Sequence, residues 1–338
     1  MTHLLAVRLD SEGDVLLAGP AIRAIAAGAD RVTLLCGPRG RQAAGLLPGV
    51  DDIRVWHAPW IDPEPEPVNR EAVDGLVAEL AALAPDRALL FGSFHQSPLP
   101  TALLLRLAGV PWIGATCTDY PGSLLDLRHR IDDDVHEVRR GLSLAAAAGY
   151  ELPAGDDGRL AVRHQRPRTG APYVVVHPGA SVPARAWAPE HHARLVDMLA
   201  ERGRRVVVTG APAERELTAR VAGPPRPGVT DLGGATTLDG LAGVLAGAEA
   251  VVVGNTGPAH LAAAVGTPVV SLYALTVPAV RWRPWQVPHE LLSVQVPCAG
   301  CRARACPVDG HPCVDDVGPE DVLGALDRVA PMREAVAA

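Results

Sequence analysis

The chain has 338 residues, of which 48% are apolar and 20% are charged, and its net charge is −7. This length and composition are sufficient for two globular domains. The acidic balance gives no basic footprint for a nucleic-acid partner, and every basic side chain is Arg because the chain contains no Lys. Mechanisms that need a lysine, such as a Walker P-loop or Schiff-base chemistry, are therefore excluded.

Neither an export signal nor a transmembrane segment is predicted. The chain opens on a strand-like run, and the apolar run that follows, residues 15–27, is broken by Pro20 and carries Arg23. Every uncharged stretch is too short to span a bilayer. We therefore expect a cytoplasmic protein. The arginines within residues 128–140 have two interpretations, a peripheral contact with a membrane and a solvated helix face.

The N-terminal half alternates short apolar strands with helices. Its periodicity predicts strands at 4–9, 32–36, 53–56, 87–91 and 112–115, and helices at 14–27, 38–47, 68–83, 100–108 and 136–148. Strands separated by helices of this length form a parallel, doubly wound sheet. Residues 151–171 then lose the periodicity and gain Pro, Gly and charge, which predicts a linker.

After the linker the strand–helix alternation restarts. Strands are predicted at 173–177, 205–209, 229–232, 251–253 and 269–272, and helices at 189–202, 213–221, 238–246, 260–265 and 319–329. We therefore predict an α/β protein with two Rossmann-like domains whose parallel, doubly wound sheets face a central cleft. The domains are residues 1–155 and 172–318, joined by a linker at 156–171. Residues 319–338 form a C-terminal helix that we expect to pack back toward the N-terminal domain.

The stretch at residues 251–274, VVVGNTGPAHLAAAVGTPVVSLYA, indicates a strand, a helix and a parallel strand. Thr256 suits the N-cap, Pro258 suits the first turn and Gly266 suits the position after the helix. Such a loop presents unpaired N–H groups at the carboxyl end of a strand, where anionic ligands bind in open α/β sheets. An ordinary crossover is the alternative interpretation of this stretch alone.

Six segments carry a resemblance to a known family. They are VRLDSEGDVL at 7–16, HEVRR at 136–140, HPGA at 177–180, RAWAPEH at 185–191, GAP at 210–212 and NTGPAHL at 255–261. In order and spacing they resemble glycosyltransferase family 9, the ADP-heptose:lipopolysaccharide heptosyltransferases. The resemblance runs from the first strand to the last helix. It implies a GT-B fold, an ADP-sugar donor held mainly by the C-terminal domain, and inversion at the anomeric carbon without a metal.

The resemblance places a general base at the Gly-Asp position of the first segment, which is Asp14 here. Inverting transfer needs a group that takes the proton from the attacking acceptor hydroxyl. Asp10 and Glu12 are alternative carboxylates, and an Asp is also favoured in the first turn of a helix for its charge alone. We expect Asp14 to be the base.

The resemblance also implies a donor site in the second domain. Arg185 matches a basic residue that contacts the donor phosphates, where a guanidinium and helix N–H groups would stabilise the leaving ADP. Asn255 stands where many members of the family carry Asp. Asn keeps the hydrogen-bonding geometry of Asp but lacks its negative charge. Glu214 and Glu216 have two interpretations. Their carboxylates accept hydrogen bonds from the ribose hydroxyls of the donor, or their negative charge stabilises the start of a helix. The expected phosphate and sugar contacts are Arg185, Gly179, Asn255, Thr256, Gly257 and His260, although His260 also suits a packed or capping role.

Four of the six cysteines gather in sixteen residues, with His311 beside them. Their spacing, Cys298-x2-Cys301-x4-Cys306-x6-Cys313, suits a structural Zn²⁺ site or a metal cluster. No cofactor is expected in catalysis itself, and the ADP-sugar is a co-substrate. Cys36 and Cys117 are interpreted as buried thiols. The triplet at 132–134 suits a solvated helix start better than a metal-binding DxD motif.

Two alternatives stay open: a GT-B-like nucleotide-sugar epimerase and a sugar- or nucleotide-binding protein without catalysis. A nicotinamide-dependent dehydrogenase is disfavoured because no G-x-G-x-x-G follows a strand. The acceptor is expected to be a glycan, a lipid-linked sugar or a secondary metabolite. Loops of the N-terminal domain, at 59–69, 94–100 and 116–130, would bind it.

Overall fold

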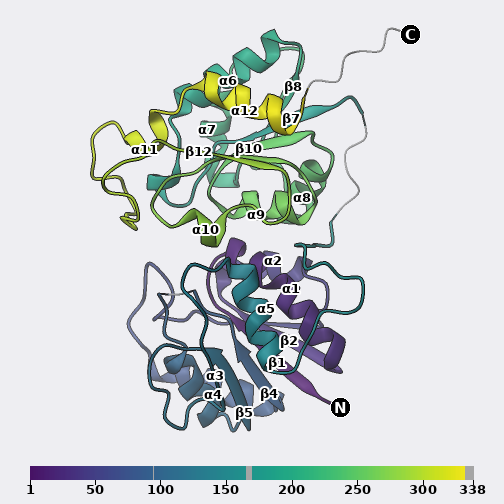
Figure 1. Ribbon diagram of the computed structural model, residues 1–338, viewed down its shortest axis with the longest axis vertical. Coiled ribbons are helices and arrows are strands. Elements are labelled where there is room, and N and C mark those ends of the chain that lie inside the picture. The colour runs from purple at the N-terminus through teal and green to yellow at the C-terminus, as the bar shows by residue number, and fades with distance from the viewer. Residues whose placement is uncertain (94, 165–169, 332–338) are drawn as a thin grey trace. The chain divides into compact units, whose positions relative to one another are not determined.

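The computed structural model describes residues 1–93, 95–164 and 170–331. The chain divides into two compact units, Met1–Arg163 and His164–Ala338 (Figure 1). This boundary lies inside the segment 156–171 that the sequence predicts as a linker. Part of that linker (165–169), one residue of the predicted loop 94–100 (Phe94) and the end of the C-terminal segment (332–338) lie outside the described residues.

The first unit is a parallel sheet covered by helices on both faces (Figure 1). Its six strands have the order β3-β2-β1-β4-β5-β6. Helix α1 packs against α2 and α5, whereas α3 packs against α4. The elements are β1 (His3–Arg8), α1 (Glu12–Gly28), β2 (Arg31–Cys36), α2 (Arg41–Leu46), β3 (Asp52–Val55), α3 (Arg70–Leu83), β4 (Arg87–Leu90), α4 (Leu99–Leu107), β5 (Trp112–Thr116), β6 (Leu127–His129) and α5 (Glu137–Ala147).

The second unit repeats this architecture with the order β12-β11-β10-β7-β8-β9. Helix α12 packs on α6 and on β10, β11 and β12 of its own unit. The elements are β7 (Tyr173–His177), α6 (Pro189–Glu201), β8 (Arg205–Val208), α7 (Arg215–Ala222), β9 (Val229–Asp231), α8 (Leu238–Ala246), β10 (Ala250–Gly254), α9 (Gly257–Ala264), β11 (Val269–Leu272), α10 (Ala279–Trp282), β12 (His289–Leu292), α11 (Pro312–Asp315) and α12 (Pro319–Val329).

The prediction of two parallel α/β sheets is confirmed. Strands β6 and β12 and helices α10 and α11 were not predicted, because each has only three or four residues and little apolar periodicity. Two predicted helices, at 38–47 and 213–221, begin with 3₁₀ turns at Pro38–Gly40 and Pro212–Glu214. The expected packing of the C-terminal segment against the N-terminal domain stays a prediction.

In both sheets all strands run parallel, but the order in which the chain lays them down reverses at one point. In each unit the chain moves outward from its first strand, then returns to place its fourth strand on the other side of the first. The loops after β1 and β4 therefore diverge, as do the loops after β7 and β10. In open α/β sheets ligands bind in the crevice at this switch point. The buried, apolar strands β7 and β10 show the full burial typical of central parallel strands.

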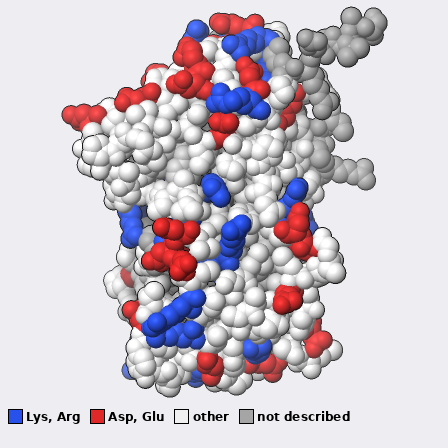
Figure 2. Space-filling view, in the orientation of Figure 1, with Lys and Arg blue, Asp and Glu red and all other residues white. Residues whose placement is uncertain are grey.

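The surface carries charges of both signs. On the face shown in Figure 2, acidic and basic side chains are interspersed among uncharged ones. Within the described part of the chain, no helix is both long enough and apolar enough to cross a membrane.

Candidate functional site

A buried arginine organises the switch point of the first unit. Arg8 is the last residue of β1, and its side chain is 4% exposed. Its Nη2 donates to Asp14 Oδ1 at 3.0 Å, to Asp10 Oδ2 at 3.4 Å and to Ser93 Oγ at 2.9 Å. Its Nη1 donates to Glu137 Oε2 at 3.5 Å. One guanidinium thus binds groups from the loop after β1, the first turn of α1, the loop after β4 and the start of α5.

The carboxylates around Arg8 compete for its single charge. Burial raises the pKa of Asp10 and of Glu137 above the ordinary carboxyl range, although Arg8 opposes the shift. Burial also disfavours the arginine cation, but the three carboxylates together raise the pKa of Arg8, so it stays protonated. Removing the guanidinium would leave buried negative charges without compensation, which is costly in a low-dielectric interior.

Asp14 is the carboxylate of this cluster that solvent reaches most easily. Its side chain is 18% exposed, against 8% for Asp10 and 1% for Glu137. Its second oxygen, Oδ2, accepts a hydrogen bond from Ser11 Oγ at 2.7 Å. The structure therefore brings Asp10 and Asp14 together on Arg8, while Glu12 is not among the groups bound to Arg8. Asp14 is oriented by two donors and still accessible, which suits a proton acceptor.

In the second unit, the loop that carries Arg185 packs directly on the turn between β10 and α9. Arg185 lies in a 3₁₀ turn at Pro183–Arg185, and its Nη1 donates to Asn255 O at 3.4 Å. Gly254 leaves no room for a side chain, because a Cβ there would lie 2.8 Å from Arg185 O. The sequence-predicted Arg185, Asn255 and Thr256 are thus neighbours.

The N-terminus of α9 completes this group. Thr256 is its N-cap residue, Gly257 is its first residue and Pro258 occupies the first turn. His260 is buried one turn further along. Thr256 Oγ1 is buried and has no hydrogen-bond partner within the described chain. A buried hydroxyl at the positive end of a helix dipole is a suitable site for an anionic oxygen.

The two acidic residues predicted near the ribose lie in different surroundings. The Glu214 carboxylate accepts from Ala211 N at 2.7 Å and lies against Gly179, where a Cβ would overlap it. Glu216 is exposed in the first turn of α7. Gly179 follows β7, so the structure places Glu214, and not Glu216, beside the switch point of the second sheet.

The side chain of Asn255 is engaged in the core. Its Nδ2 donates to Ala274 O at 3.2 Å, and its Oδ1 accepts from Ala274 N at 3.1 Å. This pair of bonds ties the loop after β10 to the residues after β11. An Asp could not donate to the carbonyl, so the pair of bonds depends on the amide. The predicted contact of Asn255 with a donor sugar stays a prediction.

The four clustered cysteines lie near one another but do not form a closed metal site in the structure. Among the described residues, no group of three or more His, Cys, Asp or Glu side chains is placed to hold a metal ion. Cys298 and Cys301 are exposed and Cys313 is buried, and burial together with the thiols of Cys298, Cys301 and Cys306 raises the pKa of Cys313. A structural metal at these cysteines stays a prediction. Cys36 and Cys117 are buried free thiols, as predicted.

The segment from Arg304 to Val317 instead positions the Arg185 loop. Ala184 N donates to Arg304 O at 2.9 Å, and His311 Nε2 lies 3.1 Å from Ala184 O. Asp315 Oδ1 accepts from Ala188 N at 2.8 Å. Sequence reasoning missed these roles because most of the contacts run through backbone groups more than a hundred residues apart. The only sequence signal was the unusual Cys- and Pro-rich composition.

Two parallel sheets of identical strand order define an α/β protein of the GT-B fold. The chain belongs to glycosyltransferase family 9 (heptosyltransferase), whose family model matches residues 94–311.

Relatives and solved structures agree with this assignment. Lipopolysaccharide heptosyltransferase 1 of Pseudomonas aeruginosa is 35% identical over 176 residues, which are 51% of this chain and 48% of that protein. The match therefore spans about half of that relative. Lipopolysaccharide heptosyltransferase 1 of Escherichia coli K12 is 29% identical over 239 residues, 68% of this chain and 72% of that protein. The structure of E. coli heptosyltransferase WaaC with ADP-2-deoxy-2-fluoro heptose shares the fold, with a TM-score of 0.74, 21% identity and coverage of 97% and 99%.

Arg8→Met is expected to destabilise the first unit by about 3–5 kcal/mol at neutral pH, because three carboxylates, two of them with side chains less than a tenth exposed, lose their cation. Carboxyl groups whose folded pKa is raised favour the folded state at low pH, and this contribution is lost as pH rises through the raised pKa. The loss in unfolding free energy should therefore be larger at about pH 8 than at about pH 5 in urea titrations. Arg54→Met is the control, since it removes a half-exposed ion pair with Glu79 and should cost at most about 1 kcal/mol. A loss that does not depend on pH would contradict this account.

Asn255→Asp is expected to reduce the unfolding free energy by about 1–3 kcal/mol, because Ala274 O loses its donor and a charge is buried. Asn69→Asp is the matched control. Asn69 caps α3 by accepting from Ala72 N, which a carboxylate does equally well, so stability should be unchanged. Equal effects of the two substitutions in urea titrations would show that Asn255 is not tied to Ala274.

Proposed function

We propose that the protein is an inverting glycosyltransferase that moves a heptose or a related sugar from an ADP-sugar to an acceptor hydroxyl. Membership of family 9 supports this class of reaction. The observation that carries the proposal is the accessible Asp14 carboxylate, which Ser11 and Arg8 orient beside a switch point. The acceptor is a glycan, a lipid-linked sugar or a small hydroxylated metabolite.

Asp14 acts as the general base in this proposal. Its carboxylate takes the proton from the acceptor hydroxyl while the acceptor oxygen forms a bond to the anomeric carbon of the donor. The bond from that carbon to the diphosphate oxygen breaks, and ADP leaves with the electron pair. Attack on the face opposite the leaving group inverts the anomeric configuration. Arg8 and Ser11 are positioning residues, since they fix the carboxylate through its two oxygens.

The second unit would hold the donor. The Arg185 guanidinium, the positive end of the α9 dipole and the buried Thr256 hydroxyl are suited to a diphosphate whose negative charge grows as it leaves. The Glu214 carboxylate can accept hydrogen bonds from ribose hydroxyls. Because these groups supply the stabilisation, we propose transfer without a catalytic metal. The complex of WaaC with an ADP-heptose analogue supports the choice of ADP-heptose.

The proposal is tested by incubating the full chain with ADP-, UDP- and GDP-sugars in buffer with EDTA, with and without acceptors. We expect ADP release from ADP-heptose that depends on the acceptor. Conversion of the donor without an acceptor would indicate an epimerase, and release of UDP or GDP would overturn the donor assignment. Failure to release or bind any nucleotide would contradict the proposed function as a whole.

Asp14→Asn is expected to lower kcat by about 10²- to 10⁴-fold, because the amide cannot take the acceptor's proton. The affinity for the donor should change little, since the donor contacts lie in the second unit. Asp132→Asn, which removes an exposed carboxylate of the first unit, is the control and should keep full activity. Full activity of Asp14→Asn would transfer the base role to another group, with Asp10 as the first candidate.

A further inference from the structure

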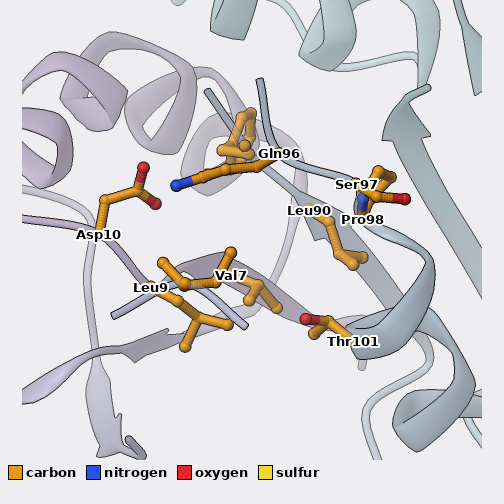
Figure 3. Close-up of a pocket in the computed structure, with 11 residues that line it drawn as sticks. Val7, Leu9, Asp10, Leu90, Gln96, Ser97, Pro98 and Thr101 are labelled. Atoms are coloured by element: carbon orange, nitrogen blue, oxygen red, sulfur yellow. The ribbon is translucent and has the colours of Figure 1, made fainter. Parts of the chain in front are cut away.

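The hollow beside Asp10 in the first unit has room for about one water molecule (Figure 3). Figure 3 shows the Gln96 nitrogen pointing toward the Asp10 carboxylate, and Ser93 N holds the Gln96 amide by donating to its Oε1 at 3.0 Å. The hollow is therefore too small for a sugar ring or a nucleotide. Buried polar groups of the second unit point to a ligand more directly.

Two threonine hydroxyls of the second unit are buried without a hydrogen-bond partner. Thr256 Oγ1 belongs to the donor site proposed above, whereas Thr276 has no role in that site so far. Thr276 follows β11 and is 3% exposed, and its Oγ1 has no partner within the described part of the chain. A buried hydroxyl that stays unpaired destabilises a fold, so each one calls for an explanation such as a bound ligand.

The loop after β11 is joined to the N-terminus of α9. The Asn255 side chain, next to the cap residue Thr256, donates to Ala274 O at 3.2 Å and accepts from Ala274 N at 3.1 Å. Thr276 follows Ala274 by two residues. The two unpaired hydroxyls therefore belong to neighbouring turns that the Asn255 amide holds together.

The loop that carries Arg185 is tied to the same turn through its backbone. Arg302 N donates to Thr276 O at 3.0 Å, and two residues later Arg304 O accepts from Ala184 N at 2.9 Å. The backbone of residues 302–304 thus joins Thr276 to the residue that precedes Arg185.

The Arg185 guanidinium also lies near this turn. Burial raises the pKa of Tyr273, and the charge of Arg185 opposes that shift, which requires the guanidinium to lie close to the Tyr273 hydroxyl. The same hydroxyl donates to Pro278 O at 3.4 Å, two residues beyond Thr276. Arg185, Thr256 and Thr276 therefore gather at one place, at the switch point of the second sheet.

We propose that the Thr276 hydroxyl donates a hydrogen bond to an oxygen of the donor's diphosphate, beside Thr256 and Arg185. The inference rests on the proposed function, because it adds a residue to the site proposed for the ADP group. A hydroxyl has one hydrogen to donate, and a charged oxygen makes that bond stronger than a neutral acceptor does. The Thr276 hydroxyl therefore destabilises the free protein and finds its partner when a diphosphate binds.

The test measures nucleotide binding to the full chain in NMR titrations without sugar or acceptor. Thr276→Val, which keeps the shape of the side chain and removes the hydroxyl, should weaken ADP binding by about tenfold or more. Binding of adenosine should stay unchanged, because adenosine carries no phosphate. Thr276→Ser keeps the hydroxyl and should bind ADP within about threefold of the unchanged protein.

Stability separates this role from a structural one. Because the hydroxyl is unpaired, Thr276→Val should keep or raise the free energy of unfolding in urea titrations of the nucleotide-free chain. Ser271→Ala is the matched control. Ser271 Oγ is also buried without a partner among the described residues, but it lies inside β11, between Val253 and Leu291 of the neighbouring strands. This control should lower neither the stability nor the affinity for ADP.

The outcomes separate this inference from the proposed function. If the unchanged protein binds no ADP, the proposed function fails and the role of Thr276 fails with it. If the unchanged protein binds ADP and Thr276→Val binds it equally tightly, the role of Thr276 alone is overturned. A lower stability or a lower adenosine affinity of Thr276→Val would show that Thr276 supports the fold instead. An equal loss of ADP affinity in Ser271→Ala would show that the effect is not specific to this site.

Discussion

One buried guanidinium holds the functional end of the first unit together. Arg8 closes β1 and binds carboxylates from three other places in the chain, one of them 129 residues away. An isolated arginine at this depth would be costly, and so would the carboxylates without it. The loop after β1, the first turn of α1 and the start of α5 are therefore fixed relative to one another. The position of Asp14 is a consequence of this mutual dependence.

The second unit uses the same strand order with different chemistry. Its switch point presents a helix N-terminus, a buried hydroxyl and an arginine on a short loop, where the first unit presents carboxylates. That loop is held by hydrogen bonds from segment 304–317, and by the close approach of Gly254 to its backbone. One unit is suited to groups that lose a proton, and the other to groups that gain negative charge. This difference between the units is consistent with the proposed transfer from a diphosphate donor to a hydroxyl.

Much of the architecture follows from local patterns. Apolar strands at regular intervals and helices of ordinary length predicted both sheets, because burial on two faces leaves a clear apolar run. The turn at Gly254–Gly257 was predictable for the same reason, since capping residues act locally. Asp14 came from the family resemblance, because a carboxylate at a helix start has an ordinary explanation as well.

The remaining features depend on contacts that no local pattern encodes. Sequence analysis did not single out Arg8, because its partner Glu137 lies far along the chain. The distinction between Glu214 and Glu216 needed the position of Gly179 in space. The cysteine spacing suggested a metal, which stays a prediction, but it gave no sign that the backbone of Arg304 holds the Arg185 loop. Short edge elements such as β6 were missed because three residues carry no measurable period.

The most direct measurement is a crystal structure of the full chain with an acceptor glycoside bound. The account predicts one hydroxyl of the glycoside within hydrogen-bond distance of the Asp14 carboxylate. It also predicts that Arg8 keeps its contacts with both Asp10 and Asp14. A glycoside bound with no hydroxyl near Asp14 would contradict the role assigned to the base.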